Sequence, residues 1–216
     1  CTIEGGMVSS NNEEIIAIAR SFAWWGRDCY CVGVQNKLKN GTCGKRFDKW
    51  LDGYDKVVDH KYVFGVQGYN LKTPDLLGSI GLIQLEKYDE IHRIRRENKE
   101  LMSKIFKRIP GTTIINEKKS AETSWFGVPI VCSDIDPKFN KKSVVKYLED
   151  NGVQTRNYFA GNLLMHPAYN GLDDPLNYPN ALRVLDKVFF VGCSPVITKD
   201  MINHIDYLVT KFLVEN

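Results

Sequence analysis

Hydrophobic residues in the first half of the chain recur mainly at the spacing of an α-helix. Asn11-Asn12-Glu13-Glu14 supplies an Asn cap and an acidic first turn, so it predicts the start of a helix that ends near Trp24. Thr73-Pro74-Asp75 predicts a second helix start, with Thr as the cap and Pro in the first turn. A third helix is predicted over 88–109, where Pro110-Gly111 ends it.

The second half of the chain has the short apolar runs of a sheet. Strands are predicted at 112–116, 124–132, 153–156 and 188–191. Gly152 closes a predicted helix over 141–151, and a last helix is predicted to begin at Thr198. That last helix is predicted to bury one face: Met201, Ile202, Ile205, Leu208, Val209 and Phe212. This order of elements predicts a small α+β domain, an open sheet with helices on one face.

The chain begins with a residue other than methionine, and residues 2–8 are predicted to be the tail of a strand turned by Gly5-Gly6. We therefore expect a fragment of a longer protein. The break at Pro110-Gly111 is a plausible domain boundary, which divides the chain into 1–109 and 110–216.

Composition sets limits on the function. The 216 residues carry 29 basic and 26 acidic side chains, and this net charge of +3 does not require nucleic acid or an anionic membrane as a partner. No apolar run approaches the ~20 residues that span a bilayer, and the first residues do not have the pattern of a signal peptide. Six cysteines without the arrangement of a disulfide framework favour a cytoplasmic location, with Cys132 and Cys193 as buried thiols on strands.

The remaining chemistry is concentrated in a segment without lasting periodicity, residues 26–69. A loop of this length inside a compact domain usually has a function or is held by something external. It contains Cys29, Cys31 and Cys43, whose thiolates can reach one soft metal centre. The spacing does not match a common zinc module, and three sulfurs leave a tetrahedral site one ligand short. Unliganded thiols or a bound zinc ion are the alternatives.

Several motifs, in order along nearly the whole chain, resemble the nucleotide-sugar aminotransferase family of fold-type-I pyridoxal phosphate (PLP) enzymes. They are Glu4-Gly5-Gly6-Met7-Val8, Trp25-Gly26-Arg27-Asp28, Gly68-Tyr69-Asn70-Leu71-Lys72-Thr73-Pro74-Asp75, Gly81-Leu82-Ile83-Gln84-Leu85, Thr155-Arg156-Asn157-Tyr158-Phe159 and Leu163-Leu164-Met165-His166-Pro167-Ala168-Tyr169. The resemblance implies an α/β protein. Residues 1–109 would be the C-terminal part of the large cofactor domain, with the cysteine loop and interdomain helices. Residues 110–216 would be the small α+β C-terminal domain.

Within that family, the Cys29-x-Cys31 pair and Thr42-Cys43-Gly44-Lys45-Arg46-Phe47 resemble the branch of CDP-4-keto-6-deoxy-D-glucose 3-dehydrases. This resemblance implies pyridoxamine phosphate and a 2Fe–2S cluster as cofactors, with Cys29, Cys31 and Cys43 as cluster ligands. It also implies a CDP-sugar substrate, a homodimer and an NADH-dependent iron–sulfur flavoprotein reductase as partner, in the biosynthesis of 3,6-dideoxyhexoses for lipopolysaccharide O-antigen. The histidine or lysine that anchors the cofactor, and a fourth cysteine, are expected before Cys1, so no catalytic residue is assigned within this chain.

The resemblance also assigns roles to polar residues outside the cysteine loop. Asn70 and Lys72 are expected to reach across a dimer interface to the cofactor phosphate, and the alternative is ordinary turn chemistry. Arg156 and Tyr158 are expected to bind the nucleotide diphosphate, and an unpaired surface Arg is the alternative for Arg156. His166 is expected either to contact the substrate or to be a structural histidine.

Two further hypotheses come from the same residues. One is a nucleotide-sugar aminotransferase that uses PLP, with a lysine just upstream of this chain in place of the histidine. The other is a non-catalytic, zinc-binding dimerisation module. Bound iron and sulfide favour the dehydrase, whereas zinc without either favours the module.

Overall fold

The computed structural model describes residues 2–29, 44–48 and 51–216. The chain divides into two compact units, Cys1–Glu86 and Lys87–Asn216. The helix predicted over 88–109 belongs to the second unit. The division at 109 and 110, which concerns the domains of the parent fold, stays a prediction.

The first unit is held by helix ends and loops more than by a large core. Helix α1 (Glu13–Ala23) begins as predicted, because the Asn12 side chain accepts hydrogen bonds from the amides of Glu14 and Ile15. A short 3₁₀ turn, η1 (His60–Tyr62), and α2 (Asp75–Glu86) are the other regular elements described here. The strand tail predicted at 2–8 is wrong: no described segment pairs with these residues, which have no regular structure apart from a bend at Ile3 and Glu4.

The second unit is built on a four-stranded antiparallel sheet. Its strands are β1 (Thr112–Ile114), β2 (Gly127–Cys132), β3 (Arg156–Asn157) and β4 (Val188–Gly192), in the order β1-β2-β4-β3. All four predicted strands are present, but their boundaries differ from the prediction. The β1 strand ends at Ile114 instead of residue 116, and β2 begins at Gly127 instead of residue 124. The β3 strand has only two residues, Arg156 and the residue after the predicted run, and β4 is one residue longer than predicted.

Helices α3 (Tyr88–Phe106), α4 (Lys141–Asp150), α5 (Pro179–Lys187) and α6 (Lys199–Glu215) complete this unit. Short 3₁₀ turns η2 (Pro137–Phe139), η3 (Leu163–Met165), η4 (Pro167–Tyr169) and η5 (Pro175–Asn177) join them. The α5 helix was not predicted, since it is short and buries none of its side chains. Among the described helices, none is both long and apolar enough to cross a membrane.

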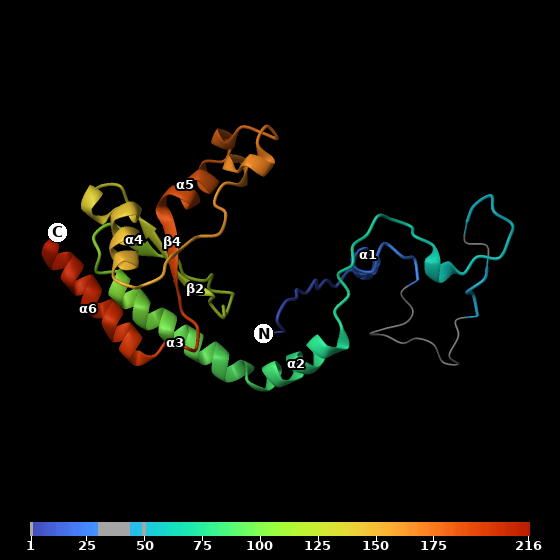
Figure 1. Ribbon diagram of the computed structural model, residues 1–216, viewed down its shortest axis with the longest axis horizontal. Helices are drawn as coiled ribbons and strands as arrows, with labels where there is room; N and C mark the ends of the chain where they lie inside the picture. The colour runs from blue at the N-terminus through green and yellow to red at the C-terminus, as the bar shows by residue number, and fades with distance from the viewer. Residues whose placement is uncertain (1, 30–43, 49–50) are drawn as a thin grey trace. The chain divides into compact units, whose positions relative to one another are not determined.

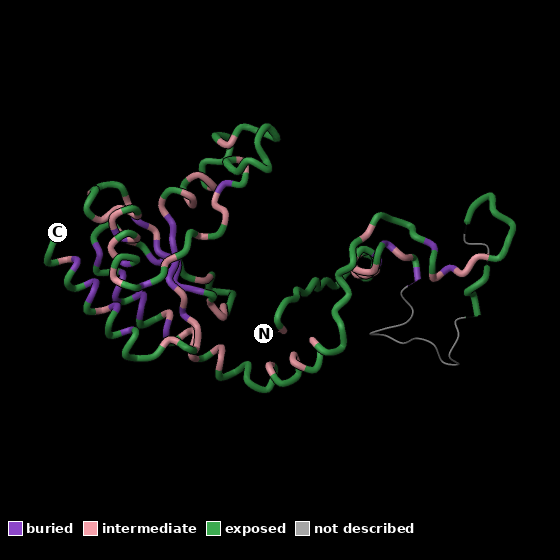
Figure 2. Tube along the Cα trace, viewed as in Figure 1, coloured by how far each residue is buried: buried purple, intermediate pink, exposed green. Residues whose placement is uncertain are grey.

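The core lies between one face of the sheet and helices α3, α4 and α6 (Figure 1), and buried residues are concentrated there (Figure 2). Alternate sheet residues such as Val128, Ile130, Phe189 and Val191 point into it, which confirms the predicted open sheet with helices on one face. The α6 helix buries the predicted residues except Met201, which is 51% exposed. Met201 lies in the first turn of α6, where it borders an open pocket lined also by Val191 and Gly192.

Cys132 and Cys193 confirm the prediction of buried thiols at strands. Cys132 ends β2, Cys193 directly follows β4, and both side chains are buried. Burial raises the pKa of each thiol to about 11. Neither is a reactive thiolate near neutral pH.

Candidate functional site

The segment that carries Asn70 and Lys72 is attached by backbone hydrogen bonds to the end of α1. The Tyr69 amide donates to the Phe22 carbonyl at 2.7 Å, and the Leu71 amide donates to the Ala23 carbonyl at 2.9 Å. The Trp25 amide donates to the Tyr69 carbonyl at 2.9 Å, and Trp24 forms an antiparallel bridge with Asn70. Two sequence motifs, 25–28 and 68–75, are therefore parts of one structural element.

Two glycines allow this close approach. Gly26 has a φ of +79°, and a Cβ placed there would lie 1.8 Å from the Val66 carbonyl oxygen. A Cβ on Gly68 would lie 2.1 Å from the Gly26 nitrogen. A side chain at either position would collide with backbone. Both motifs therefore need glycine where the chain at residue 26 crosses the chain at residues 66–68.

Asn70 and Lys72 line a groove of about 1210 Å³ in the first unit, together with α1 and residues 4–10. Both are exposed, and the Lys72 Nζ lies 5.4 Å from the centre of the Trp24 ring. An ammonium and an amide presented beside one another are suitable donors to a phosphate. The residues therefore fit the phosphate of a PLP-type cofactor, and their role as cofactor ligands stays a prediction.

Arg27 anchors the segment that leads to the cysteine loop. Its guanidinium carbon lies between 5.1 and 5.9 Å from the centres of four aromatic rings, those of Trp24, Trp25, Tyr62 and Phe64. Its Nε is buried without a hydrogen-bond partner in the described structure. Stacking on aromatic faces is a typical use of a guanidinium. This packing lets Arg27 brace the segment around residues 24–28 against residues 62–64.

The predicted metal ligands are only partly within the described structure. Cys29 is buried, with 7% of its surface exposed. It directly follows Asp28, whose amide donates a hydrogen bond to the Val63 carbonyl. Cys31 and Cys43 lie outside the described residues. No group of three His, Cys, Asp or Glu side chains suited to a metal gathers in the part of the chain that is described. The three-cysteine ligand set therefore stays a prediction.

The 3₁₀ turn η1, within the predicted loop 26–69, is fixed by an ion pair. Asp59 caps the turn by accepting from the Lys61 amide at 3.0 Å, and it also pairs with the Arg46 guanidinium. The hydrogen bond from Arg46 is the largest cause that lowers the pKa of Asp59 to about 2. This pair joins residue 46 to the segment 59–64, whose Tyr62 and Phe64 rings pack on Arg27.

In the second unit, Arg156 and Tyr158 lie at the edge of the sheet. Arg156 is exposed in β3, where its Cα is opposite that of Phe190 in β4. The Tyr158 ring packs edge-on against Phe159 and Phe190, with centroids 5.3 and 6.3 Å apart. The structure thus brings these two predicted substrate residues to one place, and their contact with a diphosphate stays a prediction.

His166 has a structural partner. Its Nε2 lies 3.0 Å from the Ala160 carbonyl oxygen, which can only accept, so Nε2 carries the hydrogen of this bond. The same loop is held by the buried Asn162, which accepts from the Leu164 amide and donates to the Pro175 carbonyl. This arrangement supports the structural reading of His166, while the exposed ring remains available to a substrate.

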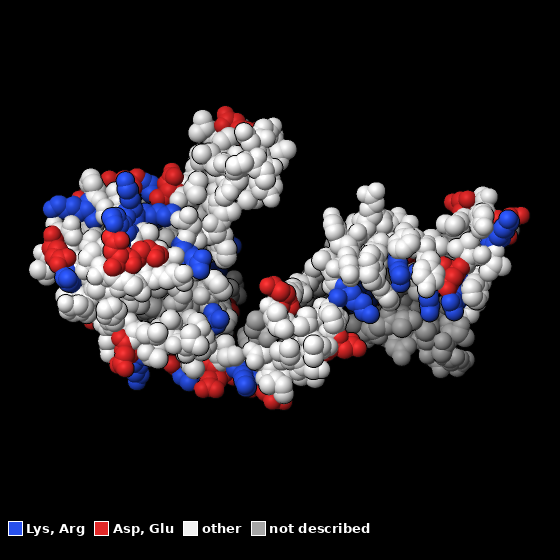
Figure 3. Space-filling model, viewed as in Figure 1, with Lys and Arg blue, Asp and Glu red and all other residues white. Residues whose placement is uncertain are grey.

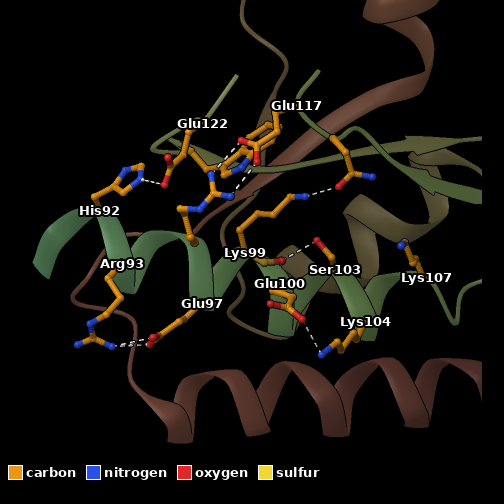
Figure 4. Close-up of a pocket in the computed structure, with 13 residues that line it drawn as sticks. His92, Arg93, Glu97, Lys99, Glu100, Ser103, Lys104, Lys107, Glu117 and Glu122 are labelled. Carbon is orange, nitrogen blue, oxygen red and sulfur yellow. Dashed lines mark hydrogen bonds and ion pairs between the residues drawn. The ribbon is translucent and has the colours of Figure 1, made fainter. Parts of the chain in front are cut away.

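A polar pocket of about 570 Å³ on α3 was not predicted (Figure 4). The charged residues of this helix do not form a simple solvated face. The Arg96 guanidinium makes two hydrogen bonds to Glu117, at 2.8 and 3.0 Å. Lys99 donates to Asn116 and lies 4.7 Å from the centre of the Trp125 ring. These contacts depend on how α3 packs against residues 116–125 in the folded unit. The periodicity of the helix alone cannot predict them.

His92 is a further residue of α3 that belongs to this pocket. Its side chain is only 15% exposed. Its ring stacks on Tyr88 with centroids 5.5 Å apart, and Nε2 lies 3.1 Å from the Glu122 carboxylate. Most charges of the pocket are therefore neutralised within the pocket itself, so it is a structural network more than a binding site.

Glu117 gives this network a pH dependence. Hydrogen bonds from Arg96 and the Thr123 amide hold its pKa at about 2, below the ordinary value of 4.5. The pKa of Glu117 is lower in the folded protein than in the unfolded chain. The ionised carboxylate therefore stabilises the fold above about pH 4.5, and this contribution is lost as the pH falls toward 2. We expect a Glu117→Gln variant to melt several degrees below the wild type at pH 7, and the gap to narrow below pH 4.5.

Thermal melts of both proteins between pH 2.5 and 7 measure this. Glu97→Gln is the matched control, because Glu97 pairs with Arg93 on the exposed side of the same helix, where ion pairs contribute little. A difference in melting temperature between the wild type and Glu117→Gln that stays constant with pH would contradict the lowered pKa of Glu117.

Charges elsewhere show no large area of one sign in the view drawn. Positive and negative side chains are interspersed over the C-terminal unit (Figure 3). This distribution agrees with the near-even composition and gives no indication of a nucleic-acid surface on that face.

Solved structures with similar folds identify the class. The chain superimposes on the E. coli GDP-4-keto-6-deoxy-D-mannose-3-dehydratase with bound hydrated PLP with a TM-score of 0.68, at 24% identity, over 93% of this chain and 48% of that one. It also matches a DegT DnrJ EryC1 StrS aminotransferase from Brucella abortus, with a TM-score of 0.64 at 14% identity, over 94% of this chain and 44% of that one. The fold is that of the fold-type-I PLP-dependent enzymes.

Sequence comparison then gives the family. The model of the DegT/DnrJ/EryC1/StrS aminotransferase family matches residues 1–210, and the chain belongs to that family. The dTDP-4-dehydro-2,6-dideoxy-D-glucose 3-dehydratase of Saccharopolyspora spinosa is 36% identical over 99% of this chain and 46% of that protein. The lipopolysaccharide biosynthesis protein RfbH of Salmonella typhimurium is 34% identical over 97% of this chain and 47% of its own length. The chain thus spans about half the length of these relatives.

Proposed function

We propose that the chain is part of a nucleotide-sugar 3-dehydratase that uses pyridoxamine phosphate and a 2Fe–2S cluster. The observation that carries this proposal is the similarity along nearly the whole chain to a protein named as a sugar 3-dehydratase. A second relative of similar identity is named for lipopolysaccharide biosynthesis. CDP-4-keto-6-deoxyglucose is the proposed substrate, on the motif resemblance around Cys29, and 3,6-dideoxyhexoses of O-antigen are the proposed destination.

In this proposal the residues of the chain bind and orient. Lys72 and Asn70 donate to the cofactor phosphate, and the Trp24 ring holds the Lys72 side chain in place. Arg156 and Tyr158 bind the substrate diphosphate from the second unit. The cofactor supplies an amine and an electron-withdrawing ring. The anchoring histidine lies outside this chain in the proposed assignment, so the chain alone is expected to be inactive.

Cluster binding is proposed on ligand chemistry. Thiolates are the usual ligands of 2Fe–2S clusters, and Cys29 is a buried thiol at the end of the segment that Arg27 braces. A cluster supplies single-electron transfer, for which an NADH-dependent iron–sulfur flavoprotein reductase is the proposed electron source. The proposed assembly is a cytoplasmic homodimer in which Lys72 and Asn70 serve the partner's cofactor.

The test is an anaerobic absorption and electron paramagnetic resonance spectrum of the intact natural protein, with iron and sulfide analysis, before and after reduction. Iron, sulfide and a signal that appears on reduction are expected. An absorption band of PLP bound to a lysine, without iron, would favour the alternative of a nucleotide-sugar aminotransferase. Zinc without iron and without cofactor would favour a non-catalytic dimerisation module.

A further inference from the structure

An exposed aromatic platform lies on the face of the sheet away from the core. Phe126 and Phe159 are each 68% exposed, although most large aromatic side chains of this unit are covered. Their ring centres are 6.4 Å apart, and each packs against the buried Phe190, at 5.6 and 6.0 Å. We call Phe126 and Phe159 the aromatic platform.

The register of the sheet shows which face carries the platform. Phe189 and Val191 point into the helix-covered core, so Phe190 between them points to the opposite face. Gly127 of β2 makes room for it, because a Cβ there would lie 2.5 Å from the Phe190 ring. The platform therefore rests on a ring that the strand pairing of β2 and β4 fixes in place.

The same register places a positive charge beside the platform. Arg156 is directly opposite Phe190 in the antiparallel pair of β3 and β4, and such partners project to the same face with Cβ atoms about 5 Å apart. Arg156 is exposed, and its neighbour Glu149 accepts hydrogen bonds from the Thr155 amide and hydroxyl at 2.5 and 2.7 Å. The Glu149 carboxylate is thus held by Thr155.

The backbone holds Phe159 in a strained conformation. Its φ is +52°, in the left-handed region that bulky residues avoid. Such strain persists where the surrounding structure fixes it, and it turns the ring toward Phe126 and solvent instead of into the loop. Burial of the ring does not compensate for this strain, because the ring remains exposed.

We propose that the aromatic platform stacks on the nucleobase of the substrate nucleotide, while Arg156 pairs with its diphosphate. This proposal rests on the proposed function and extends it to a base-binding subsite. A base has an apolar face that stacks on aromatic rings, and the adjoining diphosphate requires a cation. An exposed pair of rings beside an exposed arginine matches both parts of one ligand. Because stacking is tolerant of base identity, the platform contributes affinity for any nucleoside diphosphate.

The test uses the intact protein and calorimetric titration with CDP, and with inorganic pyrophosphate as the probe that lacks a base. Leucine replaces both rings in Phe126→Leu/Phe159→Leu, which keeps size and hydrophobicity but removes the aromatic faces. We expect CDP to bind about tenfold more weakly or worse, with pyrophosphate affinity unchanged. The pair Phe126→Tyr/Phe159→Tyr is expected to bind CDP like the wild type. Tyr207→Ala, which removes an aromatic ring that is 61% exposed on α6, is the matched control and should change neither affinity.

Unchanged CDP affinity in the leucine variant would overturn the proposal and leave the proposed function standing. A changed oligomeric mass by light scattering, with unchanged CDP affinity, would overturn it in favour of a packing surface. A wild-type protein that binds no nucleoside diphosphate would overturn this proposal together with the proposed substrate class. If the double leucine variant fails to fold, Phe126→Leu alone replaces it, because Phe126 is not at the strained backbone position. We expect this single variant to lose part of the CDP affinity and to keep the pyrophosphate affinity.

Discussion

A Gly26→Ala variant is expected to lose the backbone pairing that presents Asn70 and Lys72. A Cβ at this position would lie 1.8 Å from the Val66 carbonyl oxygen and 2.7 Å from its carbon, so backbone must move. The φ of +79° adds the ordinary strain of a left-handed residue, about 1–2 kcal/mol. Overpacking against backbone adds about 3 kcal/mol or more, so the total is a large fraction of the stability of a small unit.

Hydrogen exchange with mass spectrometry on the intact protein measures the loss. Protection is expected to fall at the amides of Trp25, Gly65 and Tyr69, which donate hydrogen bonds between residues 22–26 and residues 65–69, and to stay unchanged in β2 and β4. Affinity for pyridoxal phosphate is expected to fall as well. Gly53→Ala is the matched control: it has a φ of +75° but no atom within 4 Å of the new Cβ, so it isolates the strain from the collision. Equal losses in the two variants would show that the crossing is not what requires glycine at 26.

A Cys29→Ser variant of the intact protein is expected to lose the proposed cluster and keep the cofactor. A serine hydroxyl is a poor ligand for iron in this setting, and one missing thiolate opens the site to loss of the metal. Iron and sulfide content should fall to background. Pyridoxamine phosphate affinity should be nearly unchanged, because Lys72 and Asn70 are held by the end of α1 and not by the cysteine.

Cys132→Ala is the control for this prediction, since Cys132 is a buried thiol on β2 with no place in the proposed ligand set. It is expected to lower the melting temperature and leave the iron content unchanged. Full iron content in Cys29→Ser would remove Cys29 from the ligand set. Loss of iron together with loss of the fold, seen as lost protection around Asp28 and Val63, would instead make Cys29 a packing residue.

Local chemistry carries much of the secondary structure. Residue type predicted an Asn cap at Asn11-Asn12 and a helix start at Thr198, and the Asn12 and Thr198 side chains both accept hydrogen bonds from the amides of the following turn. Gly152 ends α4 with a φ of +81°, as a glycine after a helix usually does. These features depend on residues a few positions apart, so a single sequence contains all that is needed to predict them.

Predictions failed where the partner is distant in the chain. Residues 2–8 resemble a strand, but a strand needs a neighbour, and none of the described residues provides one. The charges of α3 have helical periodicity, yet Arg96 and Lys99 interact with Glu117 and Asn116, which follow β1. Met201 fits the apolar period of α6 but is 51% exposed, whereas Ile202 beside it is buried in the core.

The candidate sites also have features that the sequence predicts and features that only the folded structure shows. The motifs around Gly26, Asn70 and Arg156 can be identified from sequence, because residue types and order are enough to recognise a family. The sequence could not show that Gly26 and Gly68 cross at backbone distance, or that Phe126 meets Phe159 over Phe190. Sequence by itself determined the described α-helices other than α5, the Asn12 cap and the family membership, since these depend on local chemistry and on motif order. Only the tertiary structure decided which of these residues lie together, because strand register and backbone crossings join positions that are tens of residues apart.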